Sequence, residues 1–345
     1  MNQAFPLSDH YDGRRFFNPG SPATSRGLLQ VFRWRMRGQR TPWTRPAADP
    51  VFAPPPSVVP PAGVAISFIN HASFLIRFPG AVLLTDPIFI QRCSPVSWAG
   101  PMRVRPPGVA LADLPRPDLV LLSHNHYDHM DLPSLRELQR RHMPRFVTTL
   151  GNARALARYG IDATELDWWE NAVHGMLRIT ATPARHFAAR TPFDRNRTLW
   201  AGFMIRSPEG QVFFAGDSGA GSHWQDISAR LGAPDVALLP IGAYEPRWFM
   251  GAVHMNPAEA VQAHLALGAH RSVGMHFGTF QLTDEAIDAP LEALAEARRE
   301  AGIKPETFTT HGFGETRIYH FGGQARALKP LISDDALDSG RPAGN

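Results

Sequence analysis

The residues best suited to chemistry lie in one short stretch, LLSHNHYDHMD, at residues 121–131. It holds three histidines and two aspartates within eight positions: His124, His126, Asp128, His129 and Asp131. Where a strand leads into a loop, His124 and His126 can point to one side, and Asp128 with His129 to the other. Imidazoles and a carboxylate favour zinc or a similar first-row ion over magnesium, which prefers oxygen ligands. The stretch therefore suits two metal ions.

Four adjacent residues cannot complete two metal sites, so further ligands must come from other parts of the chain. Three candidates each follow an apolar, strand-like run: His186 after LRITATPAR, Asp217 after VFFAG and His276 after SVGM. The carboxylate of Asp217 can bridge two ions. A single histidine at a strand end is more often a hydrogen-bonded structural residue, but the cluster favours the ligand interpretation. A structural explanation of the cluster itself is poor, because it would pack three histidines and an aspartate with no charge to organise them.

Short strands and helices must position these residues. Strand patterns are expected at residues 64–69, 73–78, 81–85, 119–123, 145–148, 178–182, 211–215, 236–240 and 272–276. Helix patterns are expected at residues 132–141, 152–159, 224–231, 257–267 and 284–300. Strands come first and then alternate with helices. This order indicates a layered α/β fold in which the sheet is buried between helices.

Composition excludes several classes of protein. The 345 residues contain 43% hydrophobic residues, but no apolar run approaches the length of a membrane-spanning helix. The first residues lack the apolar core of a secretory signal, so we expect a cytoplasmic protein. Cys93 is the single cysteine, so it cannot form an internal disulfide or build a thiolate metal site. Any metal must therefore be held by histidine and carboxylate.

The basic charge is concentrated at the start of the chain. Residues 1–50 hold eight arginines and three aspartates, a net charge of +5, while the whole chain has +4. Within them, RGLLQVFRWRMRGQR has the composition of a helix on an anionic membrane surface, although a helix packed on the domain with a solvated arginine face explains it as well. No nucleic-acid motif accompanies the charge. We therefore predict a basic, proline-rich N-terminal arm at residues 1–62, a folded domain at 63–328 and a polar tail at 329–345.

Beyond the cluster, the motifs resemble those of the metallo-β-lactamase superfamily. More narrowly, they are similar to the N-acylphosphatidylethanolamine-hydrolysing phospholipase D family and its bacterial relatives, over about residues 64–314. The motifs that carry this likeness are ISFINHASFLIRF, LLTDPIF, ELDWWE, FFAGDSG, IGAYEPRWFM and MHFGTF. The resemblance implies a four-layer αβ/βα sandwich with a dinuclear site along the sheet edges.

The resemblance also implies the ligands and the reaction. It assigns the first zinc to His124, His126 and His186, the second to Asp128, His129 and His276, and the bridging position to Asp217. Two zinc ions per chain would leave the site near +1, which attracts an anionic ester. A metal-bridging hydroxide would then attack phosphorus, releasing an N-acylethanolamine and leaving phosphatidic acid. We expect a phospholipid substrate and a domain that acts as a phosphodiesterase.

Five neighbouring residues are candidates for supporting roles. Asp86 can accept a hydrogen bond from a ligand histidine and fix its orientation. His71 and Tyr127 are expected near the pocket. His254 could protonate the leaving oxygen or hold substrate, so with Asp128 it is a candidate catalytic residue. Asp131 is better explained as the cap of the following helix than as a further ligand.

Several alternatives stay open at this point. Animal members of the family carry glutamine where this chain has Val253, which leaves the substrate open. The runner-up is a zinc lactonase or phosphodiesterase acting on a small soluble ester. A diiron electron-transfer enzyme is disfavoured because His126 is retained and the chain has no room for a flavin module, and a non-catalytic membrane-binding protein because no ligand is missing. Peripheral binding at the inner membrane face and a homodimer are both open.

Overall fold

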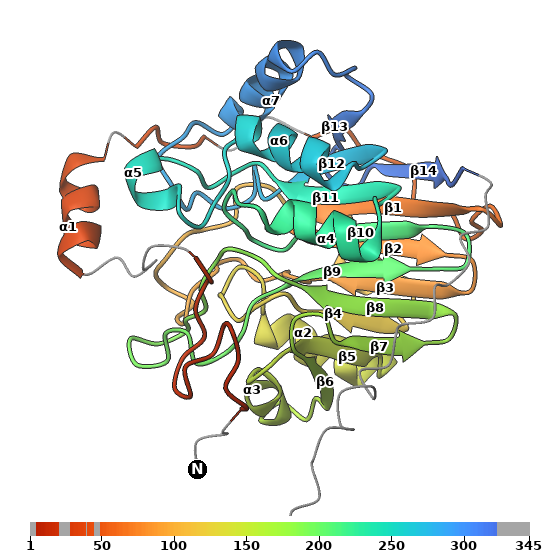
Figure 1. Cartoon of the computed structure of the whole chain (residues 1–345), viewed down its shortest axis with the longest axis horizontal. Helices are drawn as coiled ribbons and strands as arrows, with labels where there is room; N and C mark the ends of the chain where they lie inside the picture. Colours follow the sequence, from red (N-terminus) through yellow and green to blue (C-terminus); the bar gives the residue numbers. More distant parts are fainter. Residues whose placement is uncertain (1–4, 21–27, 39, 45–48, 323–345) are drawn as a thin grey trace, which may run out of the picture.

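A computed structural model describes residues 5–20, 28–38, 40–44 and 49–322 of the chain. Two seven-stranded sheets lie face to face, and helices cover their outer faces (Figure 1). The first sheet has the order β14-β1-β2-β3-β4-β5-β6 and the second the order β13-β12-β11-β10-β9-β8-β7. The four-layer αβ/βα sandwich predicted from the sequence is therefore confirmed.

The first sheet mixes antiparallel and parallel pairs. Its strands are β1 (Gly63–Asn70), β2 (Ser73–Phe78), β3 (Ala81–Thr85), β4 (Leu119–Leu121), β5 (Arg145–Thr149), β6 (Ala163–Leu166) and β14 (Thr316–His320). β14, β1, β2 and β3 pair antiparallel, whereas β3 to β6 pair parallel. Every residue of β1 is buried, because one face meets the second sheet and the other is also covered.

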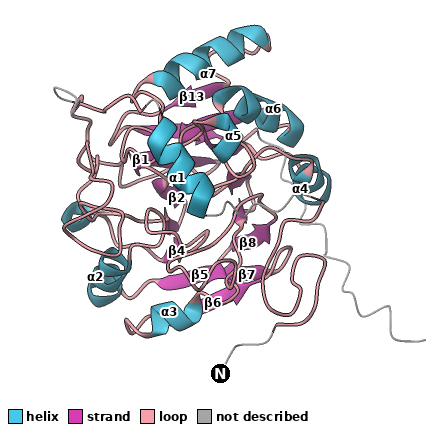
Figure 2. Cartoon of the chain, turned by 90° about the vertical axis from the view of Figure 1, so that its left-hand side faces the viewer, coloured by secondary structure: helices cyan, strands magenta, loops and turns pink. Residues whose placement is uncertain are grey.

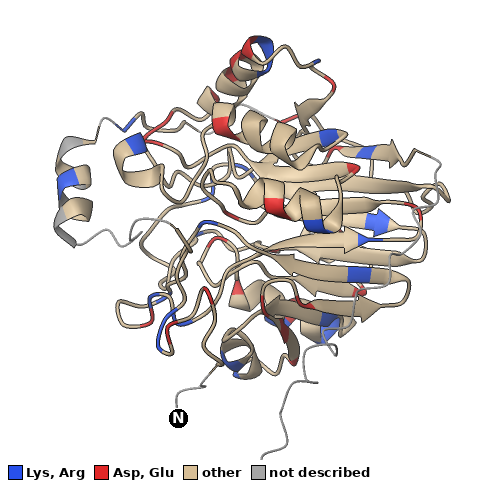
Figure 3. Ribbon diagram, viewed as in Figure 1, with Lys and Arg blue, Asp and Glu red and all other residues tan. Residues whose placement is uncertain are grey.

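The second sheet has the same mixed character. Its strands are β7 (Asn171–His174), β8 (Leu177–Thr182), β9 (Gly202–Arg206), β10 (Gln211–Phe214), β11 (Val236–Pro240), β12 (Arg271–Met275) and β13 (Phe308–Thr310). β7 to β10 pair antiparallel and β10 to β13 parallel. One hydrophobic cluster with residues of both sheets, among them Phe68, Phe74 and Phe213, fills the space between them. Figure 3 shows that charged residues lie mainly on helices, loops and strand ends.

The helices divide between the two outer faces. α2 (Leu132–His142) and α3 (Ala153–Ala157) pack on the first sheet through a second hydrophobic cluster. α4 (His223–Leu231), α6 (Pro257–Leu267) and α7 (Ala289–Glu300) cover the second sheet. The short η1 (Leu111–Asp113) is a 3-10 helix. α1 (Leu28–Arg37) and α5 (Arg247–Met250) lie together at the end of the sandwich that Figure 2 turns toward the viewer.

The structure corrects some predicted element bounds. The helix expected at residues 284–300 begins only at Ala289. The preceding residues are held by tertiary contacts instead, because the backbone of Asp284 bonds to Glu245 and the carboxylate of Glu285 accepts two amide hydrogens. β6, β7, β9, β13 and β14 were not predicted, and most are short or half-exposed strands whose apolar pattern is weak.

The N-terminal residues described in the structure contact the domain closely. Tyr11 and Phe16 are buried in the main hydrophobic cluster, and the ring of His10 stacks on Trp168 with a centroid distance of 4.3 Å. No helix or strand forms at residues 51–61, as the prolines predicted. The domain boundaries stay predictions, and the tail predicted at 329–345 lies outside the described residues. Within the described parts, every helix is too short or too polar to cross a membrane.

Candidate metal centre

All seven predicted ligands gather at one end of the two sheets, although they come from four separate loops. His124, His126, Asp128 and His129 lie between β4 and α2. His186 follows β8, Asp217 follows β10 and His276 follows β12. Their ring nitrogens and carboxylate oxygens form overlapping groups whose atoms lie within 4.8 Å of one another. The fold thus brings together residues that are up to 152 positions apart, from His124 to His276.

In the first group, three histidines direct lone pairs at one point. His124 Nδ1 lies 2.9 Å from Ser123 Oγ, which itself donates to Asp86, so Nδ1 is the protonated nitrogen and Nε2 is bare. His186 Nδ1 donates to the carbonyl of Val253 at 3.0 Å, which also leaves its Nε2 bare. His126 Nδ1 lies 2.9 Å from His124 Nε2 and 3.1 Å from His186 Nε2. These three nitrogens share at most one proton, so a cation suits the space between them.

The second group combines imidazoles with carboxylates. Asp128 Oδ2 lies 3.0 Å from His71 Nε2, 3.4 Å from His276 Nε2 and 3.6 Å from His129 Nε2. Asp86 Oδ2 accepts a hydrogen bond from His129 Nδ1 at 2.7 Å, which turns Nε2 of this ring toward the group.

Asp217 stands between the two groups. Its Oδ2 lies 3.1 Å from His129 Nε2 and 3.2 Å from His276 Nε2 on one side. On the other side the same oxygen lies 3.7 Å from His186 Nε2 and 4.0 Å from His124 Nε2. This is the position that a carboxylate shared by two cations requires.

The two groups differ in electrostatics. Burial lowers the pKa of His126 to about 4 and that of His186 to about 3, so both imidazoles are neutral near pH 7. Burial also acts on His276, but the charge of Asp217 and the nearby Asp128 carboxylate outweigh it and raise its pKa to about 9. The buried carboxylates of Asp128 and Asp217 therefore stabilise positive charge in this part of the site. Bound cations would supply such a charge.

Unpaired buried atoms test whether a metal fits. Within the described chain, no hydrogen-bond partner exists for His129 Nε2, His276 Nε2 or Asp217 Oδ1. Leaving a buried polar atom unpaired costs about 1–3 kcal/mol, so three such atoms facing one space need an explanation. Imidazole nitrogens with carboxylate oxygens are a donor set suited to zinc or a similar ion. The residues present thus fit the metal that the sequence implied.

The neighbouring candidates take different places. Asp86 contacts His129 directly and His124 through Ser123, as its expected supporting role requires. Asp131 caps α2 by accepting a hydrogen bond from the Ser134 backbone. Tyr127 is not among the described residues that line the cavity, because its ring packs beneath the Arg190 guanidinium at 4.0 Å.

Sequence reasoning missed how closely His71 approaches the second group, where it contacts Asp128.

Three residues at the site, His71, Asp86 and His276, have positive φ values of 48°, 33° and 65°. Such backbone is costly for residues other than glycine. The sequence motifs predicted these three residues at or near the site, but a polar residue directly after a strand carries no information about φ.

A cavity of about 290 Å³ opens beside the metal groups. His126, Asp128, Asp217 and His254 line its polar end. Most of the remaining lining is apolar and comes from α1, α5 and nearby loops, with Val31, Trp34, Phe249, Met250, Val253 and Leu282. The cavity therefore suits a molecule with one polar and one apolar end.

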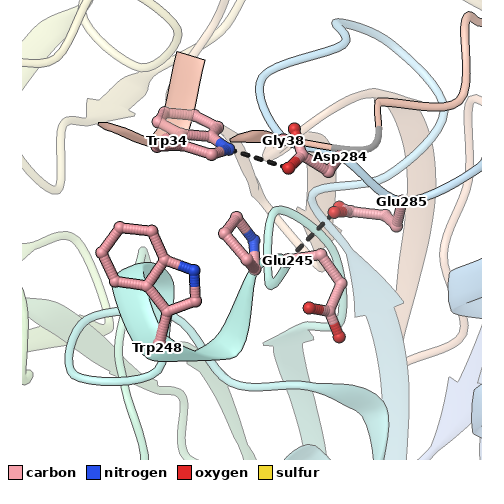
Figure 4. A pocket seen from close by; sticks show the side chains of 7 residues that line it. Trp34, Gly38, Glu245, Trp248, Asp284 and Glu285 are labelled. Atoms are coloured by element: carbon pink, nitrogen blue, oxygen red, sulfur yellow. Dashed lines mark hydrogen bonds between the residues drawn. The ribbon is translucent and has the colours of Figure 1, made fainter. Parts of the chain in front are cut away.

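α1 is held against the domain by its tryptophan (Figure 4). Trp34 Nε1 donates to Asp284 Oδ2 at 2.8 Å, and the Trp34 ring stacks on Phe249 with a centroid distance of 4.9 Å. A second cavity of about 320 Å³ lies on the outer side of this contact, between Trp34, Trp248 and Glu245. The helix predicted within the N-terminal arm is therefore present, and it forms part of the wall of the metal cavity.

Comparison with known proteins decides the family. The profile of a beta-lactamase superfamily domain matches residues 82–277, which include every predicted ligand. The chain belongs to the beta-lactamase superfamily. An uncharacterised protein of Mycobacterium tuberculosis is 37% identical over 300 residues, which cover 84% of this chain and 80% of that protein. The N-acyl-phosphatidylethanolamine-hydrolyzing phospholipase D 1 of Caenorhabditis elegans is 35% identical over 270 residues, 74% of this chain and 75% of that protein.

Solved structures of the superfamily agree with the fold. The structure of Igni18, a metallo hydrolase of the archaeon Ignicoccus hospitalis, has a TM-score of 0.57 and 25% sequence identity to this chain. The match covers 75% of this chain and 100% of the archaeal protein. The superfamily and the fold predicted from the motifs are thus confirmed.

Proposed function

We propose that the chain is a dinuclear zinc hydrolase that cleaves N-acylated phospholipids in the manner of a phospholipase D. The reaction would release an N-acylethanolamine and leave phosphatidic acid. Two kinds of support meet here: a C. elegans relative named for this activity and a fold shared with a metallo hydrolase. The observation that carries the proposal is that two ligand groups joined by Asp217 open into one cavity with an apolar wall.

The ligand roles follow from the two groups. The first zinc would be held by His124, His126 and His186, and the second by Asp128, His129 and His276, with Asp217 shared between them. Zinc, when bound, supplies positive charge for the phosphoryl oxygens and makes water acidic enough to provide a nucleophile near neutral pH.

The chain's own contribution is orientation. Asp86 and the Val253 carbonyl fix the rings of His129 and His186 before substrate arrives, so little reorganisation is needed. His254 lines the cavity, and burial lowers its pKa to about 3. A neutral His254 offers substrate one hydrogen bond but holds no extra proton for a leaving group. Of its two expected roles, holding substrate is therefore favoured.

The proposal is tested by hydrolysis of a panel that compares N-acylated phosphatidylethanolamine, phosphatidylcholine and a soluble phosphodiester, with and without added zinc. Zinc-dependent release of N-acylethanolamine is expected to be the fastest reaction. In water labelled with heavy oxygen, the label should appear in phosphatidic acid. Label in the alcohol instead would exclude attack at phosphorus.

The size of the cavity favours one second candidate. A volume of about 290 Å³ holds a headgroup and the first part of a chain, but it also fits a small soluble ester. A zinc lactonase or phosphodiesterase on small esters is therefore the alternative. Turnover of the soluble phosphodiester or a lactone at rates well above those on lipid would favour it.

We further propose that α1 faces an anionic membrane surface from which substrate enters. Met36 on this helix is 70% exposed, and the Arg33 guanidinium lies 5.5 Å from the centre of the half-exposed Trp248 ring. Basic and apolar side chains on one exposed helix suit such a surface. Met36→Asp should weaken binding to anionic vesicles, whereas Met176→Asp should not, because Met176 precedes β8 and lies at the sheet end away from the site. Equal binding by both variants would contradict the proposal.

A further inference from the structure

Arg195 is the single lysine or arginine among the described residues that line the metal cavity. The other polar residues of the lining, His126, Asp128, Asp217 and His254, all lie in or beside the metal groups. Arg195 thus adds a positive charge that no metal ligand requires.

An aromatic ring holds this arginine next to the metal groups. The Arg195 guanidinium lies 4.2 Å from the centre of the Phe187 ring. The same ring lies 4.6 Å from His126 and 5.0 Å from His186, measured between ring centres. A single aromatic ring therefore separates the guanidinium from two candidate zinc ligands. Stacking on an aromatic ring restricts the positions that a guanidinium can take.

The loop that carries Arg195 is itself well ordered by hydrogen bonds. The Asp194 carboxylate accepts from the backbone amides of Arg190 and Thr191, at 3.0 Å and 2.8 Å. The Asn196 backbone amide donates to the Ala188 carbonyl at 2.7 Å, and Arg15 donates to the carbonyl of Arg195. This loop begins directly after the ligand His186 and Phe187. The position of the guanidinium is therefore coupled to the position of the metal groups.

We infer that Arg195 binds the negatively charged, non-bridging oxygens of the substrate and so makes the site selective for anionic esters. This inference rests on the proposed function and adds a residue that decides substrate class. Guanidinium N–H groups match the geometry of phosphoryl oxygens and donate two parallel hydrogen bonds. Since most of the remaining lining is apolar, the preferred ligand is an anionic amphiphile. A neutral ester of equal chain length loses the contact with Arg195 but keeps the apolar wall.

The test measures binding rather than turnover, in zinc-loaded protein. Decylphosphonate, whose P–C bond resists hydrolysis, and neutral decanol are titrated into the wild type, Arg195→Gln, Arg195→Lys and Arg197→Gln. Arg197 is an exposed residue of the same loop outside the cavity lining, so it serves as the matched control. Zinc content and melting temperature are compared first, so that only variants equal to the wild type are used.

We expect Arg195→Gln to weaken decylphosphonate binding by about 10-fold to 100-fold, the effect of one lost hydrogen-bonded charge. The affinity of Arg195→Gln for decanol should stay within about twofold of the wild-type value, and Arg197→Gln should bind both ligands as the wild type does. Arg195→Lys should retain part of the affinity, since it keeps the charge but not the paired geometry. Equal losses for both ligands, or no loss for decylphosphonate, would overturn the inference.

The same proteins separate this inference from the proposed function. If the wild type hydrolyses no phosphodiester, but Arg195→Gln binds decylphosphonate more weakly than the wild type, the proposed function fails and the inference that Arg195 binds anions stands. If phospholipid is hydrolysed with unchanged KM by Arg195→Gln, the proposed function stands and the inference fails.

Discussion

The carboxylate of Asp86 accepts a hydrogen bond from His129 Nδ1 at 2.7 Å, although the two residues are 43 positions apart. Its second contact is with Ser123, whose hydroxyl donates to Asp86 at 2.5 Å and meets His124 Nδ1 at 2.9 Å. One buried carboxylate therefore orients two histidines that belong to different metal groups. The two groups are coupled through Asp86 as well as through Asp217.

Asp86→Asn should weaken zinc binding at both groups. The amide keeps the shape of the carboxylate but loses its charge, so His129 and His124 are held less firmly. We expect metal affinity to fall by about 10-fold to 100-fold, as is common for such supporting contacts. Competition with a chromogenic chelator measures it. Asp113→Asn, at an exposed position in η1, is the control, and affinity unchanged in Asp86→Asn would show that this hydrogen bond is dispensable.

If the wild type holds the two zinc ions proposed above, Asp217→Asn should reduce the zinc content of the purified protein to less than one equivalent. Its Oδ2 lies 3.1 Å from His129 Nε2 in one group and 3.7 Å from His186 Nε2 in the other, and an amide oxygen is a poorer bridging ligand than a carboxylate oxygen. Metal analysis after dialysis gives the count. In the wild type, removal of zinc by a chelator should also lower the melting temperature, because ligands that bind only the folded state stabilise it. Zinc at full content in Asp217→Asn would argue against a shared position.

The stability that His10 contributes to the protein should be lost as pH rises above about 6.5. Burial lowers the pKa of His10, but hydrogen bonds to Asp167 and Asp9 outweigh burial and raise the pKa above its ordinary value of 6.5. A raised pKa in the folded state gives stability that is complete below about pH 6.5 and is lost as pH rises through the folded pKa.

The measurement for His10 is the free energy of unfolding in urea between about pH 6 and about pH 9. It should fall more steeply with pH in the wild type than in His10→Gln. Parallel curves for the two proteins would mean that His10 has the same pKa in both states.

Asp284→Ala should loosen α1. The substitution removes the acceptor for Trp34 Nε1, a contact worth about 1 kcal/mol, so the helix should detach about fivefold more often. Limited trypsin digestion reports this opening as faster cleavage within residues 28–40, which contain several arginines. Asp288→Ala is the control, because the Asp288 side chain is 62% exposed and meets Arg105 only at 3.9 Å. Identical digestion of both variants would mean that the hydrogen bond from Trp34 contributes little to holding α1.

The features of the structure that were predicted best are those that depend on a local sequence pattern. Each candidate ligand follows a strand-like run, and the preceding strands, β4 in the first sheet and β8, β10 and β12 in the second, all lead to the same end of the sandwich. β9 was missed although it is buried, because its run GFMIR is short and resembles many other apolar segments. The contacts of Asn18, His71 and Arg195 depend on chain segments that are distant in sequence or on loop geometry. No periodicity in the sequence encodes such contacts.

Asn18 has a consequence for the order in which the protein assembles. Its amide group donates to the carbonyl of His186 at 2.8 Å, and its Oδ1 accepts from Trp200 Nε1 at 3.2 Å. During synthesis, Asn18 therefore waits for partners that are made 168 and 182 residues later. The rings of Tyr11 and Phe16 belong to the hydrophobic cluster that also contains Trp168, Leu199 and Trp200, so they cannot be fully buried before these residues exist. Protection of these rings should consequently follow synthesis of that region, together with closure of the loop that bears His186.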